Sequence, residues 1–491
     1  MIRKKVISAT ITLSLFQGLG RGLDLLGTLV VARFIAPEAF GVVAAALIVL
    51  QLSQSLTELN ITDALVQRDD ITRADYDTAF TISVGRGLLI TAIMSAIAGP
   101  LAASMGNSYI APVVICLSFA PLLQSLRSPK EAEYLRNVKP LLPAAVGFTG
   151  RAVGFLVMLG VVLVTKSYWA IVIGMVLGTA LSTFLSYIIA PYLPSISLKR
   201  VKWIFSFSGW LNLFTITNAG LGQFDRYFVG TRLGTDILGI YTVATSIASQ
   251  LIWSLAAPIM NALFAGLANV KNDPVRLKSA YLLAQNVIAG VMMPLGVGLA
   301  LVSTEAVALV LGPDWSLAAV VIAIIAPSTA LHMLTVGAHA SAMALGRTRS
   351  LFFRNFIALL ANVPMVIVGA IYFGVVGAAA GRALTIVLIV LLNFHLAREL
   401  VHASYIEQFR NTRRTLLSCV AMTGAVLSLS HFWPGFQNAS EIVRLIAMIA
   451  VGALTYTAAH LGLWHLEKRP DGVEATILDQ LAAILKRKSR A

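Results

Sequence analysis

Arginines inside apolar segments are the residues of this sequence with the clearest chemical meaning. Five of them lie within long apolar runs: Arg21, Arg86, Arg151, Arg226 and Arg382. Arginine stays charged in proteins, and its planar guanidinium can donate paired hydrogen bonds to phosphate oxygens. A charge at membrane depth costs about 3 kcal/mol or more unless it is paired or hydrated. Each arginine alone could reach the membrane surface or bind a backbone carbonyl, but the five together favour a polar cavity for an anion.

Two acidic residues, Asp24 and Asp225, lie in the same apolar runs as these arginines. Asp24 follows Arg21 by three residues, so a helix places both on one face, and Asp225 directly precedes Arg226. Two carboxylates cannot neutralise five arginines, so the cavity should keep a positive charge. Asp24 and Asp225 are also candidates to carry a coupling ion, either H⁺ or Na⁺.

A second candidate for ion coupling is a pair of histidines, His332 and His339. They are seven residues apart in one apolar run, a spacing that places both on one face of a continuous helix. Histidines of this kind can titrate near neutral pH and carry protons. The alternative is a packing role in which both rings are hydrogen-bonded.

Motifs of enzymatic chemistry are missing from the sequence. It contains no phosphate-binding Walker loop, and no predicted outer loop carries the acid or histidine cluster that a glycosyl transfer needs as its general base. Cys116 and Cys419 lie in separate apolar runs and predict neither a disulfide nor a metal site. We therefore expect no catalytic residue, no metal and no cofactor.

The composition explains which elements must position these charges. The chain has 491 residues, of which 58% are hydrophobic and 12% charged, and its mean hydropathy is +0.83. Soluble domains carry about 25% charged residues, so the sequence predicts an all-α integral membrane protein. The net charge of +15 falls in short loops between apolar runs, which indicates contact with anionic lipid rather than nucleic acid.

About fourteen membrane-spanning helices are expected. They cover residues 7–31, 41–64, 78–104, 109–126, 141–164, 168–190, 204–230, 237–262, 283–305, 316–343, 354–373, 375–397, 415–433 and 442–466. We divide them into six-helix halves at 1–200 and 201–400 and two additional helices within 401–466. The remaining 467–491 predicts an amphipathic, basic, cytoplasmic tail.

The distribution of Lys and Arg orients the chain. With the N-terminus inside, the inner segments hold 28 of the 37 Lys and Arg residues, and five lie within spans. The outer segments hold four, which are Arg33, Lys166, Arg232 and Arg444. Short cytoplasmic loops are enriched in positive residues, so this bias predicts both termini in the cytoplasm.

A weak internal repeat relates the two predicted halves. Residues 31–41 align with 229–239 at an offset of 198 residues, and each copy joins two spans through a loop with an acidic residue three positions before a glycine. Glu38 precedes Gly41, and Asp236 precedes Gly239. Six spans per repeat make the halves parallel, related by a pseudo-two-fold axis along the membrane normal.

Two sequence motifs resemble those of bacterial polysaccharide-unit flippases. One is Arg33-Phe-Ile-Ala-Pro-Glu-Ala-Phe-Gly41, and the other is Ala64-Leu-Val-Gln-Arg-Asp-Asp-Ile-Thr72 with Asp77-Thr-Ala-Phe80. These flippases belong to the multidrug/oligosaccharidyl-lipid/polysaccharide exporter superfamily, and the exopolysaccharide branch of succinoglycan and colanic acid is the most similar.

The resemblance implies a function. The chain would move an undecaprenyl-diphosphate-linked oligosaccharide across the bacterial inner membrane, with Arg21 at the place of a first-span arginine used by related lipid-diphosphate flippases. The two halves would alternate in opening the cavity to each side. Membrane lipid, a polysaccharide polymerase and chain-length or export proteins are the expected partners.

Three other functions fit parts of the sequence. A multidrug-type antiporter of the same fold would need a net acidic cavity, and the central charges here are mainly basic. A membrane polysaccharide polymerase or ligase would need a large outer catalytic loop. A scaffold that transports nothing would have no use for charges inside the membrane.

The predicted orientation can be tested with topology reporters. Tags inserted after Arg349 and Arg410 should report a cytoplasmic location, whereas tags after Lys166 or near Asp314 should report a periplasmic one. Two or more reversed reporters would contradict the fourteen-span arrangement.

Overall fold

The fold was analysed in a computed structural model of the chain. It describes residues 2–57, 61, 65, 71–137, 139–199, 209–270, 273–433, 435–436 and 438–467, with side chains from Thr12 onward except at 209, 211 and 257–269. These residues form helices and connecting loops, without a strand among them. The predicted tail beyond Glu467 lies outside the described residues. The all-helical class is confirmed.

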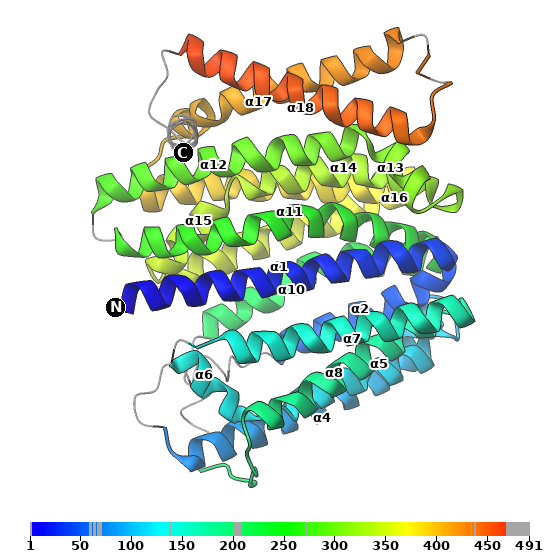
Figure 1. Cartoon of the computed structure of the whole chain (residues 1–491), viewed down its shortest axis with the longest axis vertical. Helices are drawn as coiled ribbons and strands as arrows, with labels where there is room; N and C mark the ends of the chain where they lie inside the picture. Colours follow the sequence, from blue (N-terminus) through cyan, green and yellow to red (C-terminus); the bar gives the residue numbers. More distant parts are fainter. Residues whose placement is uncertain are drawn as a thin grey trace, which may run out of the picture.

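Long helices lie side by side and run across Figure 1. The first part of the chain forms α1 (Ile2–Phe34), α2 (Pro37–Leu56), α4 (Arg73–Ser104), α5 (Ile110–Ser125), η1 (Pro129–Glu131), α6 (Ala132–Arg136), α7 (Leu141–Thr165) and α8 (Trp169–Ile189). The second part forms α10 (Gly209–Leu233), α11 (Thr235–Asn269), α12 (Pro274–Leu301), α13 (Ser303–Val310), η2 (Pro313–Trp315), α14 (Ser316–Met333), α15 (Val336–Ala344), α16 (Thr348–Val401), α17 (Tyr405–Phe432) and α18 (Glu441–Leu466). The start of α1 and the end of α18 lie on the same side, at the left of the picture.

Eleven of the described helices are long and apolar enough to cross a membrane, or twelve if α5 and the η1–α6 segment, bent by 57°, count as one broken span. α10 coincides with the predicted span 204–230 but is not among them. α16 is counted once, although Gly374 interrupts it at φ 60° and ψ −143°. Gly369 and Gly377 contact each other across this break, so α16 folds back as two helices. The number fourteen stays a prediction.

The first and second parts of the chain meet through four helices. α1 packs on α7 and α11, and α2 packs on α10 and α11. Most other contacts join helices within one part, such as α4 with α5 or α12 with α14. α17 and α18 pack on each other and on α12.

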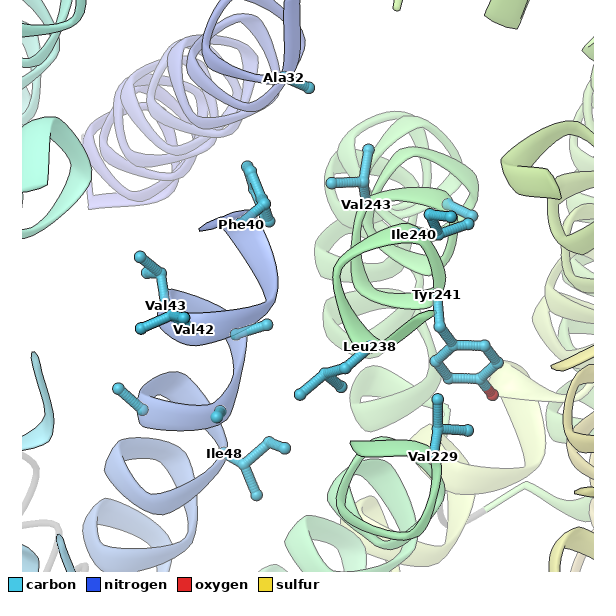
Figure 2. Close-up of a cluster of buried hydrophobic side chains, with 14 of the residues drawn as sticks. Ala32, Phe40, Val42, Val43, Ile48, Val229, Leu238, Ile240, Tyr241 and Val243 are labelled. Carbon is cyan, nitrogen blue, oxygen red and sulfur yellow. The ribbon is translucent and has the colours of Figure 1, made fainter. Parts of the chain in front are cut away.

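Two glycines let α2 and α11 cross with their backbones in contact. A Cβ atom on Gly41 would overlap the carbonyl oxygen of Thr235, and one on Gly239 would overlap that of Pro37. Pro37 and Thr235, like Gly41 and Gly239, are 198 residues apart, so the contact is reciprocal, as at a two-fold axis. Figure 2 shows the buried apolar side chains around it, including Phe40 and Leu238. This contact supports the repeat deduced from the sequence.

A second set of close backbone contacts joins α7 to α8. A Cβ atom on Gly150 or Gly154 of α7 would lie 2.6 Å from the carbonyl oxygen of Gly178 or Gly174 on α8, and the reverse contacts are equally close. Small residues four apart on both helices allow this approach. The two helices therefore pack without intervening side chains.

The reciprocal contact predicts an unequal effect of two glycine substitutions. Gly41→Ala should lower the free energy of unfolding by about 1–3 kcal/mol, because its methyl group meets backbone atoms that cannot rotate away. Gly99→Ala on α4 is the matched control, since no atom lies within 4 Å of its Cβ position, and alanine there should be neutral or stabilising. Thermal unfolding in detergent measures both. Equal melting temperatures would refute the tight crossing.

Candidate functional site

A cavity of about 750 Å³ lies within the first part of the chain. Its walls come from α1, α4, α5 and α7, from the end of α2, and from the η1–α6 segment. These are the helix ends on the side of the N-terminus, opposite the crossing of Gly41 and Gly239. The sequence predicted a central cavity between two halves, whereas this cavity belongs to the first part.

Arginine side chains reach this cavity from two helices and from the loop after α5. Arg86 of α4, Arg151 of α7 and Arg127 of the loop line it. Arg127 forms a two-pronged bond with Glu131, with nitrogen–oxygen distances of 3.0 and 3.1 Å. Glu131 is the only acidic residue among the described residues of the lining. The described part of the cavity wall therefore carries an excess of positive charge.

Arg86 also closes the end of α2. Its Nε donates to the Thr57 hydroxyl at 3.1 Å, and its Nη2 donates to the Gln54 carbonyl at 2.9 Å. The last carbonyls of a helix have no partner within the helix, so the guanidinium supplies one and meets the negative end of the helix dipole. Arg86 thus combines a capping role with a place in the cavity wall.

Arg151 pairs with Asp24 across the seam between α7 and α1. Its Nη1 lies 3.4 Å from Asp24 Oδ2, and both side chains are 53% exposed. The guanidinium rests against Gly20, where a Cβ atom would lie 2.7 Å from Nη1. The sequence had matched Asp24 with its neighbour Arg21, so the partner found here is a different arginine. An ion pair this exposed can release either partner at little cost.

Arg21 occupies another place. Its Nη1 donates to the backbone carbonyl of Trp253 on α11 at 3.0 Å, and the side chain is half-buried. Arg21 is not among the residues that line the cavity. It therefore links α1 of the first part to α11 of the second.

The remaining predicted charges form a separate buried cluster in the second part. Asp225 of α10 accepts hydrogen bonds from Arg382 Nη1 at 2.7 Å and from the Tyr241 hydroxyl at 2.6 Å. Its side chain is 1% exposed. Arg226, the adjacent residue, donates to the Thr245 hydroxyl at 3.2 Å. An exchangeable cation at Asp225 would have to compete with a guanidinium already in contact with it.

His332 and His339 do not lie on one continuous helix. α14 ends at Met333 and α15 begins at Val336, so the seven-residue spacing does not place them on one face. The expectation of a shared helix face was wrong because the helix breaks between them. The His339 ring packs on Phe214, with centroids 5.3 Å apart, which fits the packing alternative.

Arg354 is a buried charge that the sequence analysis did not identify. Arg354 was counted with the inner loop, yet it is 9% exposed and donates to the side-chain oxygens of Asn355 and Asn393. Asn393 in turn donates to the Thr335 hydroxyl at 2.8 Å. No salt bridge of Arg354 occurs among the described residues. The sequence signal that could have identified Arg354 as buried is its position inside the aromatic run 352–356.

A sequence profile of a family described as polysaccharide biosynthesis protein matches residues 30–320, more than half of the chain. The chain belongs to this family.

Two curated relatives match most of this chain. The lipopolysaccharide biosynthesis protein WzxC of Escherichia coli K12 is 22% identical over 420 residues, which are 83% of this chain and 84% of WzxC. The succinoglycan biosynthesis transport protein ExoT of Rhizobium meliloti is 22% identical over 460 residues, 93% of each chain.

Solved structures share its fold. The lipid II flippase MurJ in an inward closed conformation superposes with a TM-score of 0.77 at 15% identity, covering 94% of this chain and all of MurJ. An inward-facing multidrug resistance transporter of the MATE family reaches a TM-score of 0.57 at 15% identity, covering 78% and 94%. The fold is that of these transporters, and the agreement is better with MurJ.

The two ion pairs of the site should respond differently to neutralisation. Asp225→Asn leaves the Arg382 charge buried without a carboxylate and should destabilise the protein by about 3–5 kcal/mol. Asp24→Asn, at an exposed pair, should cost about 1 kcal/mol or less. Adding Arg382→Gln to Asp225→Asn should restore part of the loss, because the uncompensated charge is then gone. Unfolding temperatures in detergent decide this, and equal losses in both single variants would contradict it.

Proposed function

We propose that this protein is a flippase that moves an undecaprenyl-diphosphate-linked oligosaccharide repeat unit across the bacterial inner membrane for exopolysaccharide synthesis. Membership of the polysaccharide biosynthesis family, the similarity to a succinoglycan transport protein and the MurJ-like fold support it. The observation that carries it is the arginine-lined cavity inside the first part of the chain.

The cavity wall matches the two chemical parts of such a headgroup. Arg86, Arg127 and Arg151 supply guanidinium donors for a diphosphate, which planar bidentate donors bind well. The exposed pair of Arg151 with Asp24 leaves that arginine able to exchange its carboxylate for a phosphate oxygen. Entry of the diphosphate would then free Asp24.

Amide and aromatic side chains of the same wall suit a sugar. Gln17, Gln54 and Gln124 offer amide groups, which can both donate to and accept from hydroxyls, and Phe16, Phe80 and Phe148 present rings. The volume of about 750 Å³ lies in the usual range of roughly 300–1,000 Å³ for small-molecule sites. A short oligosaccharide headgroup fits this size, while the long polyprenyl chain would stay in the bilayer.

We take alternating access as the mechanism. Residues 1–200 and 201–400 would move as two halves, and residues 401–466 would accompany the second. The crossing of Gly41 and Gly239 closes the side opposite the cavity, so release there would require these two glycines to separate. The process makes and breaks no covalent bond, and so needs no catalytic residue.

The proposed orientation places both termini in the cytoplasm, with a polysaccharide polymerase and chain-length or export proteins taking over the unit outside. A multidrug-type antiporter is disfavoured because three arginines face one acid in the described lining. Asp24, Asp225 and the two histidines stay candidates for ion coupling.

Proteoliposomes containing a radiolabelled lipid-linked oligosaccharide test the activity, and failure of the purified protein to move it between leaflets would refute the proposal.

Substitution of single arginines should distinguish a role in binding the substrate from a role in the folded structure. Arg151→Ala loses charge-assisted hydrogen bonds worth about 1.5–3 kcal/mol, so the KM for the lipid-linked sugar should rise roughly 10- to 150-fold. Arg151→Lys should recover part of this, because a point charge cannot reproduce the planar fork. Lys166→Ala, at the opposite end of α7, is the control. Transport with an unchanged KM in Arg151→Ala would contradict the diphosphate role.

Arg21 makes a distinct prediction in the same assay. If it joins the diphosphate site during transport, Arg21→Ala should abolish transport at normal membrane levels, and Arg21→Lys should restore it only partly. If it serves only as the link to the Trp253 carbonyl, Arg21→Ala should lower thermal stability while the remaining folded protein transports normally. In the first of these cases, Asp24→Asn should impair transport less than Arg21→Ala.

A further inference from the structure

The connection between the two parts of the chain begins as an extended segment bound to α4. After α8, residues 190–199 are not helical. Asp77 of α4 accepts hydrogen bonds from the Tyr192 hydroxyl at 2.7 Å and from the backbone N–H of Ser195 at 2.9 Å. The N–H of Ser197 donates to the Thr81 hydroxyl at 3.0 Å. Asp77 and Thr81 are four residues apart on α4, so one face of the helix binds alternate residues of the segment.

The end of α8 and the start of this segment bind residues beside the cavity. Tyr134 of α6 donates its hydroxyl to the Ile189 carbonyl at 2.8 Å, and the Ser128 hydroxyl donates to the Ala190 carbonyl at 2.7 Å. The Tyr192 ring packs edge-on against Tyr76, with centroids 6.0 Å apart. The segment is thus held by polar contacts on its inner side, and Asp77, a member of the motif 77–80, has a defined structural partner.

The outer side of the segment is apolar and uncovered. Leu193, Ile196 and Leu198 are 84%, 89% and 60% exposed. Lys199 follows them, and the sequence continues with Arg200 and Lys202. The segment lies at the end of α4 that faces the side of the N-terminus, near the lower left of Figure 1. Three large apolar side chains beside basic residues match the interface of an anionic lipid leaflet.

We propose that residues 191–199 are an interfacial strap whose outer apolar side chains enter the leaflet on the side of the N-terminus. Asp77 and Thr81 bind its backbone N–H groups, which avoids leaving them unsatisfied at the edge of the hydrocarbon. The positive residues that follow select a leaflet containing anionic lipid such as phosphatidylglycerol. The strap thereby holds the start of the inter-half connection against the cavity wall.

Fluorescence quenching in vesicles tests the position of the strap. Full-length protein with Cys116→Ala and Cys419→Ala carries one cysteine, from Ile196→Cys or from Ser197→Cys, labelled with an environment-sensitive dye. The vesicles contain phosphatidylethanolamine and phosphatidylglycerol, with or without lipid brominated near the headgroup. The outward probe at 196 should be quenched by the brominated lipid, and the inward probe at 197 much less. Equal quenching at both positions, or quenching of the 196 probe by aqueous iodide alone, would overturn the proposal.

Release of the strap gives a second, independent result. Asp77→Ala removes the acceptor for Tyr192 and Ser195 and should reduce the lipid quenching of the 196 probe. Ser195→Ala is a milder variant, because it loses a side-chain hydrogen bond to Asp77 but keeps the backbone N–H that Asp77 binds, and it should reduce the quenching less than Asp77→Ala. Cross-linking of two 196 cysteines to each other in the membrane would assign this face to a second copy and refute the lipid contact. None of these results depends on transport activity.

Discussion

The packing of two backbones at Gly41 and Gly239 is the interaction on which the arrangement depends. Only α1, α2, α10 and α11 join the two parts of the chain extensively, and the reciprocal crossing is the point at which no side chain separates them. Other contacts converge nearby. Phe40 packs edge-on against Trp315, 6.1 Å between centroids, and Asn107 donates to the Thr235 hydroxyl at 3.3 Å. The cavity lies at the opposite end of α1 and α2, among helices of the first part alone.

Local sequence patterns predicted the features that depend only on residues close together in the chain. Hydropathy gave the membrane class and the position of most helices, and the spacing of the two loops gave the repeat that the glycine crossing supports. Arg86 and Arg151 line a cavity within the first part, whereas the sequence placed them in a central cavity, and their role in binding stays a prediction. The partner of Asp24 could not be deduced, because Arg151 is 127 residues away and reaches it only through the packing of α7 on α1. Arg354 was misplaced because a charge near a helix end has the same pattern whether it is buried or in a loop.

Arg151 of the first part and Arg354 of the second part are held by opposite kinds of contact. Arg151 is half exposed and held by an ion pair that solvent can enter, whereas Arg354 is enclosed by the amide oxygens of Asn355 and Asn393. Amides satisfy the donors of a guanidinium without cancelling its charge. Arg151 therefore keeps more capacity to bind an anion than Arg354 does.

The glycine pairs between α7 and α8 have a mechanical consequence. Because Gly150, Gly154, Gly174 and Gly178 bring the two backbones together, neither helix can slide or tilt without pushing carbonyls into the other. α7 and α8 should therefore move as one rigid unit, and α7 forms one side of the cavity. Any widening of the cavity must come from its other walls. Among these, α1 is joined to α7 by the Arg151–Asp24 ion pair and the Phe16–Phe148 aromatic contact. The size of the largest ligand that fits is therefore set by how far these walls can move, and α7 with α8 forms the fixed side.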